Sequence, residues 1–122
     1  MSAPAGGDCV FCRIVRKELD AKVVYEDADV VAFRDIHPQA PTHVLVVPRE
    51  HVGTLSAVED GANGARLLGR LMQGVRATAA ALGHSAEDGY RVVINCGERA
   101  AQSVFHLHAH VLGGRMLGWP PG

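Results

Sequence analysis

Three histidines, His106, His108 and His110, alternate with apolar residues in the segment FHLHAHVLGG. In a β-strand successive side chains point to opposite faces, so an extended segment would place the three imidazoles on one face and bury the other. Imidazole is a metal ligand, and in its neutral form it is also a nucleophile and a proton carrier. Two kinds of chemistry are therefore open: a metal centre, or attack on an electrophile.

The spacing of these histidines favours the nucleophile. A mononuclear metal prefers ligands spread in three dimensions, whereas alternate residues of one strand lie in a row, about 7 Å apart at Cα. Nucleophilic attack requires one imidazole, a neighbour that orients or protonates it, and donors for an oxyanion. Gln102 and Ser103, at the end of a polar loop over residues 96–103, offer such donors. A phosphoryl or nucleotidyl group would suit this arrangement.

Strands must position the histidine segment, and runs rich in β-branched residues predict where they lie. The predicted strands cover residues 22–26, 30–34, 43–48, 90–95 and 105–112, the first two forming a hairpin. The strand over 43–48 is apolar almost throughout, which predicts burial on both faces.

Apolar residues at helical spacing predict the helices. The longest covers residues 65–82 and ends at Gly83, and shorter helical segments are expected over 10–17 and 54–58. The pattern as a whole predicts an α+β domain, with a five-stranded, mostly antiparallel sheet, one long helix and one or two short helices.

Length and composition bound the domain organisation. The 122 residues, 48% of them apolar, suffice for one domain over 9–122 that ends in an irregular tail over 115–122. The small, Gly-rich residues 1–8 are expected to be a disordered lead-in. The net charge of −1 gives no support for a nucleic-acid partner. We expect no membrane partner and a cytoplasmic location, because neither a spanning run nor a signal peptide is evident.

The histidine segment resembles the signature of the histidine triad (HIT) superfamily, and the similarity extends beyond it. The blocks FRDIHPQAPTHVLVVPREH, GYRVVINCGERAAQSVFHLHAHVLGG and the closing WPPG resemble the histidine triad nucleotide-binding proteins, the purine nucleoside phosphoramidase branch. The resemblance covers about residues 8–122. The closing WPPG argues against the dinucleoside polyphosphate hydrolase branch.

The resemblance implies a hydrolase that cleaves the P–N bond of purine nucleoside 5′-phosphoramidates without a catalytic metal. His108 would form a covalent nucleotidyl intermediate, and His110 would contact the phosphate. His43 would contact the triad and help to deliver a proton to the leaving amine. Gln102 and Ser103 would bind the phosphate and the leaving-group side.

The resemblance also implies a purine nucleotide as ligand and a homodimer whose two sheets are joined. Asp35 would hold the ribose hydroxyls, although it could instead cap the turn before His37. Trp119 would reach the site of the partner subunit. The remaining nucleotide contacts would come from Phe11, Ile14, Phe33, Ile36 and Asn95. No role is expected for His37 or for His84, which is predicted to face solvent.

The loop before the triad departs from the relatives. They often carry glycine before the Gln-Ser pair, where this chain has Ala100 and Ala101. If the loop requires a positive φ there, alanine costs about 1 kcal/mol or more.

Cys9 and Cys12 have the C-x-x-C spacing of a zinc half-site. A redox role would require a preceding strand, and none is predicted. Many bacterial histidine triad proteins bind zinc through two cysteines and two histidines, so the resemblance implies a structural Zn²⁺ on Cys9, Cys12, His51 and His106. The alternative is a pair of reduced, partly buried thiols. No role is assigned to Cys96.

Other functions stay open at this point. A nucleotide-sensing or scaffold protein with incidental hydrolysis would use the same residues as an enzyme. A dinucleoside polyphosphate or adenylyl-sulfate hydrolase would differ in its products. A pure metal-binding protein would use the three histidines as ligands, and chelators would abolish its activity.

Overall fold

The structure is a computed structural model, and it describes residues 9–122. The predicted lead-in, residues 1–8, lies outside this range. Five antiparallel strands form one sheet in the order β1-β2-β3-β5-β4. They are β1 (Val23–Glu26), β2 (Val30–Arg34), β3 (Thr42–Pro48), β4 (Tyr90–Val93) and β5 (Ala109–Gly113). The α+β prediction with a five-stranded antiparallel sheet is confirmed.

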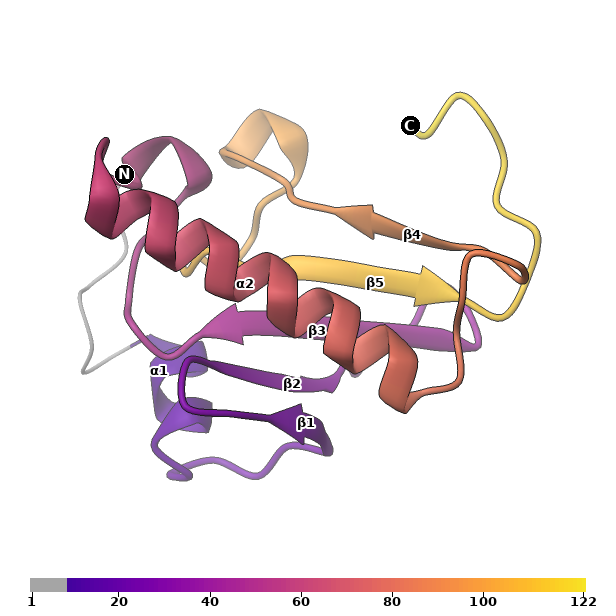
Figure 1. Ribbon diagram of the computed structural model, residues 1–122, viewed down its shortest axis with the longest axis horizontal. Coiled ribbons are helices and arrows are strands. Elements are labelled where there is room, and N and C mark those ends of the chain that lie inside the picture. The colour runs from indigo at the N-terminus through magenta and orange to yellow at the C-terminus, as the bar shows by residue number, and fades with distance from the viewer. Residues whose placement is uncertain (1–8) are drawn as a thin grey trace.

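Helices cover the two faces of this sheet unequally. The long helix α2 (Ala62–Ala81) lies across one face, and the six-residue α1 (Val10–Val15) lies on the other side (Figure 1). Two short 3₁₀ turns, η1 (Leu55–Ala57) and η2 (Glu98–Ala100), complete the elements. Within residues 9–122 no helix is long and apolar enough to span a bilayer.

Two apolar clusters follow from the period of two in the strands. Val44, Val46, Ala109 and Val111 point toward α2 and form the larger cluster. The alternate residues of the central strands, including Leu45, form a second cluster with α1 on the opposite face. The prediction that β3 is buried on both faces is therefore confirmed, since all its residues after Thr42 are buried.

The last strand is shorter than predicted. Strand β5 pairs with β3 only from Ala109 onward, and residues 105–108 lie outside the sheet. The backbone N–H of Leu107 donates instead to the carbonyl of Val52 at 2.6 Å, which draws this segment toward the loop after β3. The side chains nevertheless keep their alternation, because Leu107 packs in the same cluster as Ala109. The predicted strand over 105–112 is thus corrected at its first four residues.

The connection after α2 corrects a second prediction. Gly83 ends the helix with φ +82°, as its position predicts. His84 does not face solvent: its side chain is 9% exposed and contacts Thr42 at 2.8 Å and Asp88 at 3.0 Å. Space for the ring exists because Gly113 has no side chain, and a Cβ there would lie 2.9 Å from the imidazole. The helix also begins three residues earlier than predicted, and β4 ends two residues earlier.

Two glycines of α2 differ in their surroundings and give a matched test of the packing. A Cβ added at Gly74 would lie 2.6 Å from a methyl group of Val30, whereas one at Gly69 would meet nothing within 4 Å. We expect Gly74→Ala to lower the free energy of unfolding by about 1–3 kcal/mol through overpacking. Gly69→Ala should raise it by about 0.5–1 kcal/mol through helix propensity. Denaturant unfolding of both variants measures the difference, and equal effects at the two sites would contradict the close approach of α2 to β2.

Candidate functional site

A cavity of about 840 Å³ opens on the face of the sheet opposite α2. Its walls come from α1, from the ends of β2 and β3, and from the segment that carries the triad. The predicted site residues that line it are Phe11, Ile14, Phe33, Asp35, Ile36, Ser103, His108 and His110. Predicted site residues that are nearly 100 positions apart in the sequence thus line one cavity.

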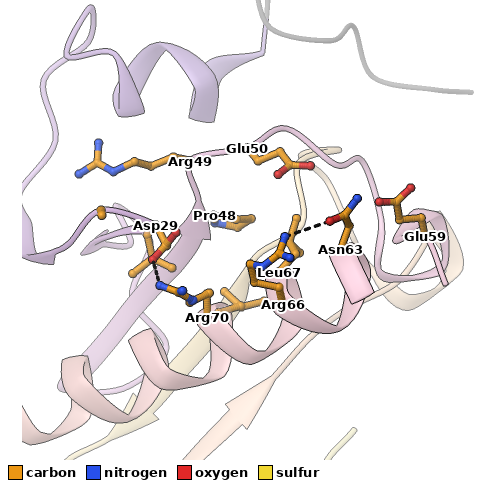
Figure 2. Close-up of a pocket in the computed structure, with 12 residues that line it drawn as sticks. Asp29, Pro48, Arg49, Glu50, Glu59, Asn63, Arg66, Leu67 and Arg70 are labelled. Atoms are coloured by element: carbon orange, nitrogen blue, oxygen red, sulfur yellow. Dashed lines mark hydrogen bonds and ion pairs between the residues drawn. The ribbon is translucent and has the colours of Figure 1, made fainter. Parts of the chain in front are cut away.

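A smaller cavity of about 480 Å³ lies between Pro48–Glu50 and the first half of α2 (Figure 2). No predicted site residue lines it. Its side chains include one ion pair, Arg70 with Asp29 at 2.8 Å, and Arg66 contacts the neutral Asn63 at 3.0 Å. The larger cavity, which contains the histidines, is therefore the candidate active site.

The nitrogen that His108 presents to this cavity is set by a backbone carbonyl. Nδ1 of His108 lies 2.7 Å from the carbonyl oxygen of His106. A carbonyl only accepts, so Nδ1 carries the proton and Nε2 of the neutral ring keeps a lone pair. The ring is buried, and its edge contact with Phe11 has a centroid distance of 5.1 Å. His108 thus has the tautomer that a nucleophile at Nε2 requires.

His43 and His110 form a hydrogen-bonded pair beside His108. They are diagonal neighbours on β3 and β5, since His43 lies opposite Leu112 in the antiparallel register. The backbone N–H of Gln39 donates to Nδ1 of His43 at 3.0 Å, so the proton of the neutral ring is on Nε2. That Nε2 donates to Nδ1 of His110 at 2.9 Å. His110 is therefore left with a proton on its own Nε2.

Asp35 caps the turn before His37 and also lines the cavity. One carboxylate oxygen accepts from the backbone N–H of His37 at 2.7 Å, which is the turn-capping contact. The other lies 3.4 Å from Nε2 of His43, and the side chain also lines the cavity. The cap therefore fixes a carboxylate at the wall of the cavity without removing it from reach of a ligand.

The two cysteines meet two histidines in a compact cluster. Ligand atoms of Cys9, Cys12, His51 and His106 all lie within 4.8 Å of one another. Nε2 of His106 lies 2.8 Å from the carbonyl of Pro48 and so carries the proton, which leaves the lone pair of Nδ1 directed at the cluster.

The distances in this cluster fit tetrahedral zinc. Both thiol sulfurs lie 3.5 Å from Nδ1 of His106, and Nδ1 of His51 lies 3.2 Å from that nitrogen and from the sulfur of Cys12. Zinc–sulfur and zinc–nitrogen bonds of about 2.3 and 2.05 Å give tetrahedral edges of about 3.6 Å for S···N and about 3.3 Å for N···N. The donor set, its burial and its geometry therefore fit a structural Zn²⁺.

Comparison with known proteins decides the family. The family model described as HIT domain matches residues 16–117. A 14 kDa zinc-binding protein of Zea mays is 47% identical over 113 residues, which are 93% of this chain and 87% of the maize protein. An uncharacterised HIT-like protein of Synechococcus elongatus is 49% identical over 94% of this chain and 97% of its own length.

A solved structure agrees. The crystal structure of a HIT family hydrolase from Legionella pneumophila superposes with a TM-score of 0.88 at 44% identity, covering 94% of this chain and all of the other. This chain belongs to the HIT family. The similarity supports a hydrolase, and the zinc-binding relative agrees with the Cys₂His₂ cluster found here.

Several predicted residues do not line the cavity of this HIT domain. Gln102 is buried, and its amide donates to the carbonyls of Gly53 and Val104 and accepts from the N–H of Gly97. It therefore shapes the loop that presents Ser103. Asn95 is half-buried outside the cavity wall, and Trp119 is 81% exposed in the C-terminal tail.

The loop before the triad does require a positive φ at one of its two alanines. Ala101 adopts φ +70° and ψ 28°, in the left-handed region. Alanine there costs about 1 kcal/mol relative to glycine. The next residues are nevertheless held in place, because the backbone N–H groups of Ala101 and Gln102 bond to Glu98 and Gly97.

Burial keeps the histidines of the site neutral. It lowers the pKa of His110 to about 4, with the neighbouring His108 and His43 acting in the same direction and Asp35 opposing them. Burial also lowers the pKa of His108 and His43, in both cases against the attraction of Asp35. Neutral rings near pH 7 are what nucleophilic attack and proton transfer through this pair require.

This lowered pKa predicts a pH-dependent stability. The unfolded chain binds a proton at His110 below about pH 6.5, whereas the folded chain binds it only near pH 4. Stability therefore falls as the pH drops from about 6.5 to about 4, and this contribution is absent above that window. In His110→Asn the slope of unfolding free energy against pH should be smaller by up to about 1 kcal/mol per pH unit, after allowance for solvent screening. Unfolding of both metal-loaded proteins between pH 7 and 4.5 measures it, and identical slopes would show that His110 is not shielded.

Proposed function

We propose that this HIT domain cleaves the P–N bond of purine nucleoside 5′-phosphoramidates, releasing the nucleoside monophosphate and an amine. One observation carries the proposal: His108, whose Nε2 keeps a lone pair, lines a largely apolar cavity that has a carboxylate at its wall. A cavity of about 840 Å³ is in the range of small-molecule sites and large enough for a mononucleotide.

The cavity wall supports a purine nucleotide as the substrate. Phe11 and Phe33 pack edge to face at a centroid distance of 5.4 Å, and together with Ile14 they give an apolar slot for a flat base. The carboxylate of Asp35 lines the same cavity and would accept from the hydroxyl groups of a ribose. Vicinal hydroxyl groups donate well to a carboxylate, because hydrogen bonds to charged acceptors are the stronger ones.

The reaction proceeds in two displacements. Nε2 of His108 attacks phosphorus, a His108–phosphorus bond forms, and the bond from phosphorus to the amine nitrogen breaks. The amine nitrogen takes up a proton from solvent, relayed through the His43–His110 pair, as it leaves, and Ser103 also lines the cavity. A water oxygen then attacks phosphorus, the His108–phosphorus bond breaks, and the proton that the water loses returns to solvent by the same route. The nucleoside monophosphate is released and His108 is neutral again.

The metal cluster has a structural role in this proposal. When bound, Zn²⁺ supplies four bonds that tie the start of α1 to the loop after β3 and to the first triad histidine. Cys9, Cys12, His51 and His106 would hold it, and none of these four residues lines the cavity. The proposal therefore keeps this Zn²⁺ away from the reacting phosphorus.

A nucleophile variant tests the proposal directly. We expect His108→Asn to lower kcat on adenosine 5′-phosphoramidates by roughly 10³-fold or more while the Kd for AMP changes little, because the lost group acts only in bond formation. Rapid quench of the wild-type protein, followed by mass spectrometry, should detect a nucleotidyl adduct on His108.

Near-full activity of His108→Asn would refute the assignment of the nucleophile. A wild-type kcat below about 0.01 s⁻¹ on every amidate tried would favour a nucleotide sensor, because ordinary enzymes turn over at about 1–10³ s⁻¹. Preferential cleavage of dinucleoside polyphosphates or adenylyl sulfate would move the chain to another branch of the family.

We also propose that the chain acts as a homodimer joined along β4. Strands β1 and β4 are the two edges of the sheet. The register shift in β1 makes that edge a poor template for further pairing. The C-terminal tail runs on the β4 side (Figure 1), where Arg91 donates to the carbonyl of Gly118 at 2.7 Å, and Trp119 in this tail is 81% exposed. A second chain at this edge would therefore meet Trp119.

Complementation tests the dimer and the reach of Trp119 together. We expect sedimentation to give about twice the 12.9 kDa of one chain. His108→Asn and Trp119→Ala should each be impaired alone. A mixed dimer should regain one working site, because the Trp119→Ala subunit keeps its own His108 and receives the intact Trp119 of its partner. Mixing without any gain in activity, or a monomeric mass, would refute this arrangement.

A cytoplasmic location completes the proposal. None of the described cysteines forms a disulfide, and zinc-ligating thiols persist in reducing compartments. Fractionation of cells that express the tagged chain would test this directly.

A further inference from the structure

Phe11 is close in sequence to the cysteines of the metal cluster, and its side chain lies at the proposed nucleotide cavity. It lies between Cys9 and Cys12, and its ring lines the cavity. The ring packs edge-on against the nucleophile His108 at 5.1 Å and against the metal-side His106 at 6.0 Å, measured between centroids. A single buried side chain therefore contacts both centres.

The helix that carries Phe11 depends on tertiary contacts for its stability. Helix α1 has only six residues, and a helix of that length is not stable in water without tertiary support. Its first turn is tied down through Cys9, whose sulfur accepts from the N–H of Cys12 at 3.5 Å, and through the contacts of both sulfurs with His106. Metal bonds to these two sulfurs would fix the turn from which Phe11 projects.

A second link runs from the cluster to the nucleophile. The carbonyl of His106 accepts from Nδ1 of His108 and so sets its tautomer. The ring of the same His106 is oriented by Pro48 on one side and by the cluster on the other. Ordering His106 therefore also orders the ring that faces the ligand.

We propose that metal binding at the cysteine cluster and nucleotide binding in the cavity are positively coupled, with Phe11 as the positioning residue that links them. The inference rests on the proposed nucleotide site and goes beyond it. With the metal bound, the Phe11 wall is in place before the base enters. Without it, the nucleotide must order α1 itself and binds more weakly. Because the coupling is reciprocal, a bound nucleotide must tighten metal binding by the same factor.

The experiment measures both directions with AMP, a product that is not turned over. Calorimetry on the Zn²⁺-loaded protein and on protein treated with a chelator should give a Kd for AMP that is about tenfold higher without metal. Competition with a chromogenic chelator should show Zn²⁺ held about tenfold more tightly at saturating AMP. This second arm starts from folded, metal-loaded protein, so it remains decisive even where the metal-free chain unfolds.

Variants at two cavity positions separate coupling from simple loss of contact. Phe11→Ala keeps all four metal ligands, and we expect the effect of metal on the Kd for AMP, and of AMP on Zn²⁺ affinity, to fall below about twofold. Phe11→Leu should restore part of it. Ile36→Ala is the matched control: Ile36 lines the same cavity from the β2–β3 connection and is 86% exposed. It should weaken AMP binding while leaving the tenfold ratio intact.

The outcomes are distinct. AMP that binds the metal-loaded protein, yet leaves its Zn²⁺ affinity unchanged, would overturn the coupling and leave the proposed function standing. An unchanged tenfold ratio in Phe11→Ala would overturn the role of Phe11. AMP that does not bind the metal-loaded protein at all would overturn both this inference and the nucleotide site.

Discussion

The hydrogen bond from Nδ1 of His108 to the carbonyl of His106 is the interaction on which the site depends. It joins two alternate residues of one segment, so it needs no distant element to form. It makes Nε2 the basic nitrogen of a buried ring, and burial lowers the pKa of that ring so that it stays neutral. Without this bond the proton could occupy either nitrogen, and the ring would present a donor where a lone pair is needed.

The bond requires that residues 106–108 leave the β-ladder. In a regular strand the carbonyl of His106 would be available to a neighbouring strand, as the carbonyls of β3 and β5 are to each other. Here the segment turns toward the loop after β3 through the contact of Leu107 with Val52. That shift also brings the ring of His106 to the carbonyl of Pro48 and its Nδ1 to the cysteines. The Cys₂His₂ cluster and the tautomer of His108 thus follow from one local departure from the sheet.

Sequence periodicity predicted the fold class, because the pattern of apolar residues along a strand indicates which of its two faces is buried. The apolar run of β3 predicted burial on both sides, and the alternation in the triad segment predicted that the residues between the histidines are buried. It could not predict where β5 begins, because an extended chain alternates in the same way whether or not its backbone pairs. His84 was missed for a similar reason: the space that buries it is left by Gly113, a residue distant in sequence that pairs with Thr42.

Eight of the predicted site residues line the cavity, whereas Gln102, Asn95 and Trp119 do not. Three histidines of one type carry different tasks, and the difference lies in which nitrogen each has already used. His106 gives Nε2–H to Pro48 and keeps Nδ1 for the cluster, while His108 gives Nδ1–H and keeps Nε2 for the cavity.

His110 accepts at Nδ1 from His43 and keeps a proton at Nε2. The groups that fix these ring protons are two backbone carbonyls and the imidazole of His43, and only the last of them was implied by the resemblance. Gln102 illustrates the same limit, since an amide beside the triad could bind a ligand or hold the loop, and its three internal hydrogen bonds assign it to the loop. Chemistry at this site is therefore encoded in the hydrogen-bond partners of the histidines, and only the folded chain supplies them.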